Sequence, residues 1–176
     1  VLLDYAKDTV EYEKAKTVFA QQNRPDVIAI ATYATDPTET LELVYKNPWH
    51  WALVANDLPA DQLKAATFFG GKKFKFGVYQ VKTAADRAAL KGKERAVVVD
   101  HNIVGEHMDA ALVGELGSQP VGSITWKFKS LAYITPRYLT ENEMALIDAD
   151  YAIAYVMKAG KAQTSEGTLA NGEFID

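Results

Sequence analysis

Hydrophobic and polar residues follow two patterns along this chain, one typical of helices and one of buried strands. The clearest strand signal is residues 95–102, Arg-Ala-Val-Val-Val-Asp-His-Asn, where consecutive valines have no polar residue between them. A short apolar run of this kind predicts a strand buried on both faces, at the centre of a parallel or mixed sheet. We expect the rest of the fold to be arranged around it.

Three further strands are predicted ahead of this central one. Residues 26–33 contain Val-Ile-Ala-Ile-Ala, and residues 49–56 are Trp-His-Trp-Ala-Leu-Val-Ala-Asn. Residues 73–82 alternate between apolar and polar side chains, which predicts a strand with one face in solvent, near a sheet edge. His50 lies on the face opposite the two tryptophans, where we expect it to face solvent or to be satisfied locally.

Residues with helical spacing separate these strands, and we predict helices over residues 8–22, 38–45, 57–69, 84–90 and 105–116. The first helix is expected to start with a capping box of Asp8 and Glu11 and to bury Tyr12, Ala15 and Phe19. Helices and strands that alternate in this way predict βαβ units. The expected fold is α/β, with a mixed, mostly parallel sheet of about four core strands flanked by helices.

The last third of the chain predicts a small C-terminal α+β or hairpin addition to this core. Residues 123–129 alternate between apolar and polar side chains, as in a strand. Thr140 and Glu143 have the spacing of a capping box, which predicts a helix to about residue 149. Residues 151–158 predict a strand that turns at residues 159–161 into a hairpin.

Composition excludes several classes of protein. Hydrophobic residues make up 48% and charged residues 24% of the chain, the balance of an ordinary globular domain. The net charge of -4 argues against a nucleic-acid binder, which usually carries a basic excess. There is no cysteine, so disulfides and thiolate zinc sites are excluded. No apolar run approaches the roughly 20 residues needed to span a bilayer, and no signal peptide is recognised.

The chain ends suggest that more polypeptide surrounds this sequence. Its first residue is not methionine, and the closing Phe174-Ile175-Asp176 resembles the start of another strand. We therefore expect the chain to be a fragment of a longer protein.

Candidate chemistry gathers at the end of the central strand. In open α/β sheets, ligands bind at the carboxyl ends of strands. Asp100, His101 and Asn102 occupy that position. One cluster has metal-ligand or acid-base residue types, formed by Asp100, His101, Glu106, His107 and Asp109. Its two histidines match no standard zinc spacing. The same residues would also serve as ordinary strand termination and helix capping, so both interpretations stay open.

Other kinds of site are less consistent with the sequence. Gly70-Gly71-Lys72-Lys73 follows a predicted helix, whereas a phosphate-binding loop precedes one. A serine hydrolase on an α/β sheet would need a Gly-x-Ser-x-Gly elbow, which the chain lacks. The tryptophans and tyrosines mostly sit in buried or alternating patterns, which favours core positions over a glycan-binding surface.

A series of short motifs carries a resemblance to a known family. The motifs are Trp126-Lys127-Phe128-Lys129, Ile134-Thr135-Pro136, Leu139-Thr140-Glu141-Asn142-Glu143, Asp150-Tyr151-Ala152-Ile153-Ala154-Tyr155 and the stretch from Gly167 to Gly172-Glu173-Phe174-Ile175-Asp176. In this order they resemble the tail sheath proteins of contractile bacteriophages and prophages. The N-terminal part, residues 11–21 followed by Arg24-Pro25 and an apolar run, is similar to the helix that precedes the first core strand of that family.

The resemblance implies a structural protein rather than an enzyme, with no catalytic, cofactor-binding or metal-binding residue. Residues 1–122 would form the α/β sheath core, and residues 123–176 its C-terminal strand-helix-strand part. The implied partners are other copies of the subunit in hexameric rings, joined by added strands, together with tail tube and baseplate proteins. Neither nucleic acid nor membrane is an implied partner.

The implied location is the virion, and the bacterial host cytoplasm during assembly. The cluster Lys72, Lys73 and Lys75, which composition alone assigns to a solvated turn, would then suit contacts between rings. The alternative function is an α/β enzyme or ligand-binding module with its site at the end of the 95–102 strand.

Overall fold

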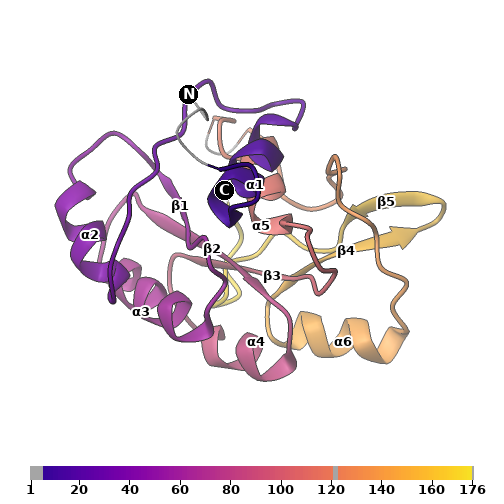
Figure 1. The fold of residues 1–176 in the computed structure, drawn as a ribbon. Coiled ribbons are helices and arrows are strands. Elements are labelled where there is room, and N and C mark those ends of the chain that lie inside the picture. Colours follow the sequence, from indigo (N-terminus) through magenta and orange to yellow (C-terminus); the bar gives the residue numbers. More distant parts are fainter. Residues whose placement is uncertain (1–5, 121–122, 176) are drawn as a thin grey trace.

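The computed structural model describes residues 6–120 and 123–175. Over these residues five strands form one sheet, in the order β1-β2-β3-β4-β5. They are β1 (Trp51–Leu53), β2 (Phe76–Val81), β3 (Ala96–Asp100), β4 (Ile153–Lys158) and β5 (Lys161–Thr164). Strands β1 to β4 are parallel, and β5 is antiparallel to β4. The α/β fold with a mixed, mostly parallel sheet is thus confirmed (Figure 1).

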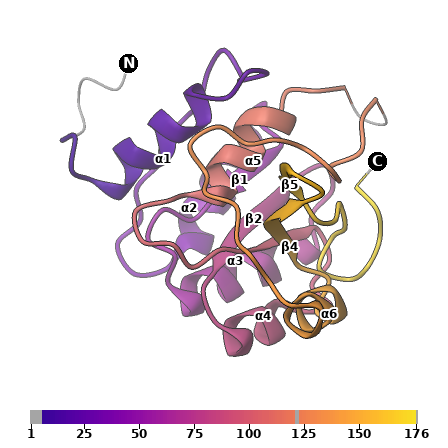
Figure 2. The ribbon, with the colours of Figure 1, turned by 90° about the vertical axis from the view of Figure 1, so that its right-hand side faces the viewer.

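Helices cover both faces of the sheet (Figures 1 and 2). One face packs against α2 (Pro37–Val44), α3 (Pro59–Gly70), α4 (Ala84–Leu90) and α6 (Glu141–Ala149). The other face packs against α5 (Met108–Leu116), and α1 (Val10–Phe19) lies beside α5. The core is therefore two apolar layers with the sheet between them.

The central strand confirms the prediction made from the valine run. Every residue of β3 is buried. Val97 and Val99 pack toward α5, whereas Ala96 and Val98 pack toward α3 and α4. A strand with helices on both sides has no wet face, which explains why its sequence does not alternate.

The strand predicted at residues 26–33 is wrong. The structure has no regular secondary structure over residues 27–33, and Val27 is 79% exposed. The fourth parallel strand is β4, which pairs with β3 through Val99 and Asp100. An apolar run can indicate a strand, but a strand forms only when its backbone pairs with a neighbouring strand. That pairing depends on residues far away in the sequence.

Two other strand predictions need correction. β2 is buried on both faces, so the wet face predicted for residues 73–82 is wrong: β2 lies between β1 and β3, with helices on both sides. Phe74 lies outside the strand and is 73% exposed. Residues 123–129 form no strand; Trp126 is buried, and Phe128 has a positive φ of 63° that interrupts an extended backbone.

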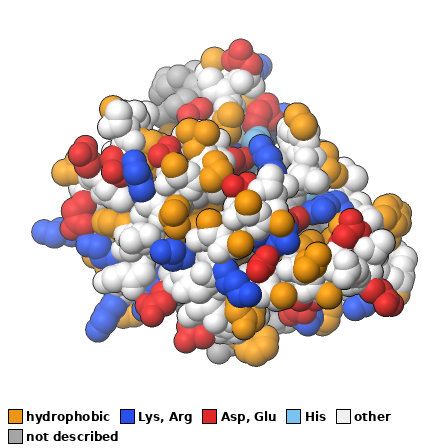
Figure 3. Space-filling model, turned by 90° about the horizontal axis from the view of Figure 1, so that it is seen from below, with side chains coloured by type: hydrophobic (Ala, Val, Ile, Leu, Met, Phe, Trp, Pro, Cys, Tyr) orange, Lys and Arg blue, Asp and Glu red, His pale blue; other side chains and the backbone are white. Residues whose placement is uncertain are grey.

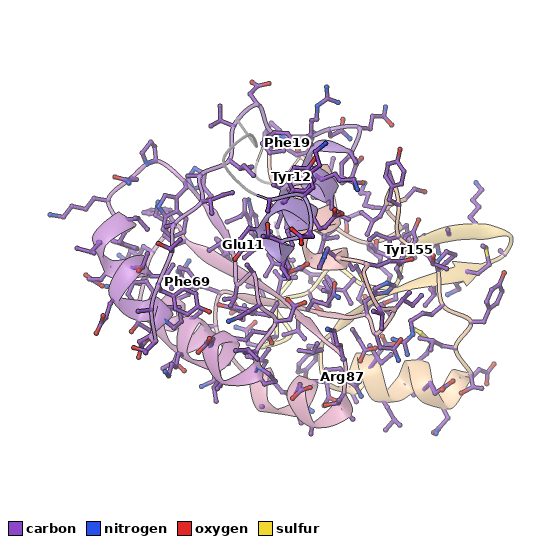
Figure 4. The ribbon with its side chains drawn as sticks, in the orientation of Figure 1. Glu11, Tyr12, Phe19, Phe69, Arg87 and Tyr155 are labelled. Atoms are coloured by element: carbon purple, nitrogen blue, oxygen red, sulfur yellow. The ribbon has the colours of Figure 1, made fainter. Side chains whose placement is uncertain are left out.

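Helix ends differ in how well the sequence predicts them. The capping box of Thr140 and Glu143 at the start of α6 is confirmed. At α1 the cap is Thr9, whose hydroxyl accepts a hydrogen bond from the Tyr12 amide, so the predicted Asp8 cap is wrong. The buried face of α1 is Lys14, Ala15 and Val18, while Tyr12 and Phe19 are half-buried near the outer side of the molecule (Figure 4).

The predicted hairpin is confirmed. β4 and β5 pair from Tyr155 with Thr164 to Lys158 with Lys161. Ala159 and Gly160 form the turn, and both have positive φ, at 49° and 78°. A two-residue turn of this kind matches the twist of the strands it joins.

Candidate functional site

Asp100, at the carboxyl end of β3, lies in a buried network of ion pairs. One carboxylate oxygen accepts from Arg87 of α4, and the other accepts from Arg137. Arg87 also donates from Nε to Asp150, at the end of α6 (3.0 Å), and it lies between α4 and α6 (Figure 4). Only 5% of the Asp100 side chain is exposed. Both of its oxygens are thus occupied by arginines of the protein itself.

This network joins parts of the chain that are far apart in sequence. Arg87 and Asp100 belong to the α/β core, whereas Arg137 and Asp150 belong to the C-terminal part. Breaking one partner of a buried pair leaves an uncompensated charge, which is strongly destabilising. The network therefore holds the C-terminal residues against the sheet. The Asp100 carboxylate is not free to bind a substrate.

His101 is fully buried directly after this strand. Its Nε2 lies 2.8 Å from Glu106. Glu106 also accepts hydrogen bonds from the backbone and the hydroxyl of Thr135 (2.8 and 2.6 Å). Burial lowers the pKa of His101, although the bond to Glu106 opposes this shift. The ring is therefore neutral near pH 7, donating from Nε2, and its buried Nδ1 has no partner among the described residues.

The remaining predicted site residues are not brought to one point. His107 precedes α5 without capping it through its side chain, and Asn102 is exposed. Asp109 turns toward α1 and contacts Lys14. Within residues 6–120 and 123–175, no three histidine, aspartate or glutamate side chains are placed to share a metal ion. The predicted cluster is thus divided between separate hydrogen-bond networks.

A second buried charge cluster was not predicted from the sequence. Lys14 of α1 donates from Nζ to Asp57 (2.6 Å), to Asp109 (2.5 Å) and to the carbonyl of Val54 (3.0 Å). All three charged side chains are less than a tenth exposed. The cluster ties α1 to α5 and to the loop after β1. The sequence feature that could have indicated this cluster is the position of Lys14, four residues before Val18 and therefore on the same face of the helix.

Burial sets the electrostatics of this cluster. It raises the pKa of Asp57, and the nearby Asp109 raises it further. Burial alone would lower the pKa of Lys14, but Asp109 and Asp57 outweigh it and raise that pKa above its ordinary value. Lys14 is therefore a charged lysine held between two carboxylates, and not a neutral amine available as a base or nucleophile.

The two edge strands of the sheet, β1 and β5, differ in whether other residues hydrogen-bond to their outer backbone groups. At β5, Thr164 donates its amide to Lys129 (2.9 Å) and accepts from Phe128 (3.0 Å), so residues beside the strand cover its outer side. At the opposite edge, β2 is the one strand paired with β1 within the described residues. An uncovered edge is a ready template for another strand. The β1 edge is therefore the side of the sheet open to strand addition.

The lysine cluster proposed for contacts between rings is partly engaged within the protein. Lys75 is 8% exposed, and its Nζ donates to the carbonyl of Asn47 (2.7 Å). Lys72 pairs with Glu42 (2.8 Å) and lies over the Tyr45 ring, 4.9 Å from its centre. Replacing either residue would disturb local packing as well as surface charge.

None of the helices in the described residues is long and apolar enough to cross a membrane.

Comparison with protein-family models and with curated proteins gave no assignment. No protein-family model matches this chain, and no curated protein matches it.

Proposed function

We propose that this chain is a structural subunit of a contractile phage or prophage tail sheath, which polymerises around a tail tube and contracts during DNA delivery. The observation that carries the proposal is the ordered series of motifs between Trp126 and Asp176, together with the N-terminal helix and Arg24-Pro25. The proposed partners are other copies of the chain in hexameric rings, and tail tube and baseplate proteins. The proposed location is the virion, and the host cytoplasm during assembly.

The positions of the motif residues are consistent with a packing role. Gly167 lies against Trp126 and Lys127, and a side chain there would come within 2.8 Å of the Lys127 amide nitrogen. Ile175 donates its amide to the Gly167 carbonyl (3.1 Å), and Thr168 bridges to Phe174. These motif residues therefore hold the C-terminal segment against itself and against residues 126–127, which is consistent with a packing role.

The charged groups at the carboxyl ends of the strands support the same proposal. Asp100 is occupied by two arginines, and Lys14 by two aspartates. A subunit that transmits force during contraction needs its helices held firmly to its sheet. The alternative, an enzyme or ligand-binding module at the end of the 95–102 strand, has less support because Asp100 and His101 are already bonded within the protein.

Surface charge favours protein partners over nucleic acid. Viewed from the side of α3, α4 and α6, positive and negative side chains are interspersed (Figure 3). The net charge is -4. Such a face suits reciprocal contacts between identical subunits, in which each charge can meet its opposite.

Electron microscopy tests the proposal. We would express the 176-residue chain, and separately the complete open reading frame that encodes it, and stain both at low and high salt. Rings or long hollow tubes from the complete protein are the expected result. Monomer-sized particles from both samples under all conditions would contradict the proposal. Metal bound in stoichiometric amount to the purified chain would instead favour the alternative.

A further inference from the structure

Residues 26–33, here named the strap, lie outside the sheet, and hydrogen bonds hold the two ends of the strap near the two ends of β1, the strand at the open edge. Just before the strap, the Asn23 carbonyl accepts a hydrogen bond from Ser118, beyond the end of α5. At the same end of the sheet, Trp51 of β1 donates from its indole nitrogen to the Gly117 carbonyl (3.1 Å). The strap therefore starts near the amino end of β1.

The other end of the strap is held near the carboxyl end of β1. The Tyr33 hydroxyl accepts from the Asn56 side chain (2.8 Å) and donates to Asp61 (2.8 Å). Asn56 lies three residues beyond β1. The strap thus runs in the same direction as β1, on the side where Figure 1 places α2.

Among the residues that the structure describes, backbone groups on both the strap and β1 lack hydrogen-bond partners. Phe76 of β2 donates to the His50 carbonyl (2.8 Å). Because successive residues of a strand point their backbone groups to opposite sides, those of Trp51 and Leu53 face away from β2. Within the described residues, the strap backbone makes one hydrogen bond, from the Thr40 hydroxyl to the Thr32 carbonyl (2.9 Å). Unpaired backbone groups on two adjacent segments would be satisfied by pairing with each other.

The side chains of the strap have the period of a strand. Ile28 and Ile30 are half-buried, whereas Val27, Ala29 and Ala31 are exposed. This alternation gives one face turned inward and one turned to solvent, which is the pattern of a strand at a sheet edge.

The tether at Tyr33 and the half-buried isoleucines together favour one register for a docked strap. With Tyr33 level with the residues after β1, Ile30 comes opposite Ala52. That register places Ile30 on the face where Ala52 and Leu41 of α2 pack into the same core cluster. The neighbouring alanines of the strap then face the other way, toward solvent. A shift by one residue would turn both isoleucines out of the core.

The connection has the usual handedness. Strap, α2 and β1 would form a βαβ unit next to the unit of β1, α3 and β2. Both helices pack on the same face of the sheet, and both connections advance in the same direction across it. The two crossovers therefore share one hand, as expected for parallel strands.

We propose that the strap is a displaceable edge strand. Docked beside β1 with Ile30 opposite Ala52, it pairs with the outward backbone groups of β1 and closes the edge. Undocked, which is its state in the structure, it leaves that edge open to a strand from another chain. Docking within one chain thereby controls access to the open edge, whether or not the chain builds a sheath.

Engineered cysteines test the docked state. The chain has no cysteine, so an introduced pair provides its only thiols. Neighbouring strands lie about 4.8 Å apart, within the range that a disulfide bridges. Under mild oxidation, the variant Ile30→Cys/Ala52→Cys should lose both thiols and stay monomeric. The matched control Ala31→Cys/Ala52→Cys puts the two sulfurs on opposite faces and should keep its thiols.

Three results would overturn the proposal: no cross-link in the first variant, equal cross-linking in both, or covalent dimers in place of an intrachain bond. Hydrogen exchange on the unmodified chain gives a second measurement that does not depend on variants. The Leu53 amide should be protected to an extent similar to the Ala52 amide, which faces β2. Exchange of Leu53 at the rate of an open amide, with Ala52 protected, would show that the strap does not dock.

Discussion

Replacing Lys14 by methionine tests whether the buried charge cluster stabilises the fold. Methionine keeps the length and helix propensity of lysine but removes its charge. Asp57 and Asp109 then lose the ammonium group that lies 2.6 and 2.5 Å from them. Removing one partner of a buried ion pair costs about 3–5 kcal/mol. We expect Lys14→Met to lose that much of a total stability of about 5–15 kcal/mol.

The loss should be visible in both chemical and thermal unfolding. For a domain of this length, each kcal/mol shifts the midpoint by about 2–4 °C, so we expect Tm to fall by roughly 6–20 °C. Urea unfolding followed by tryptophan fluorescence would give the free energy directly. The matched control is Lys16→Met on the same helix. Its side chain is 62% exposed and pairs with Glu13 at the surface, so its effect should stay within about 0.5 kcal/mol.

The pH dependence of the variant separates charge from packing. Burial and Asp109 already raise the pKa of Asp57, and loss of Lys14 would raise it further. A carboxyl group with a raised folded-state pKa destabilises the fold at neutral pH, and this penalty disappears as the pH falls and the group is protonated. The deficit of Lys14→Met should therefore shrink between pH 7 and pH 5. A deficit that is small at pH 7, or independent of pH, would refute the reasoning.

Three other predictions use the same unfolding assay. Gly114→Ala would place a methyl group 2.5 Å from the Val18 carbonyl between α5 and α1, so it should cost about 1–3 kcal/mol; Gly70→Ala, with open space around it, should cost nothing. Tyr79→Phe removes a buried hydroxyl that has no partner in the described residues, and should leave stability unchanged or higher. Burial lowers the pKa of His101, so stability should fall as the pH drops below about 6.5, less steeply in His101→Gln.

Sequence alone determined the features whose physical causes lie within a few residues. The valine run identified β3 as a central strand because apolar side chains lie on both of its faces, and both faces are buried. Thr140 and Glu143 fixed the start of α6, since a capping box needs only residues three apart. Ala159 and Gly160 are at the turn predicted between the last two strands. From these local signals and the alternation of helices and strands, the α/β class followed.

Tertiary structure decided which elements pair and which charges meet. The partners of Asp100 lie 13 and 37 residues away, and Lys14 reaches Asp109 across 95 residues. No local pattern encodes such distances, so the predicted cluster at the end of β3 could not be resolved into separate ion networks. Residues 26–33 show the same limit. Their continuous apolar run is typical of a strand, but whether a strand forms depends on a neighbouring backbone that the sequence does not specify.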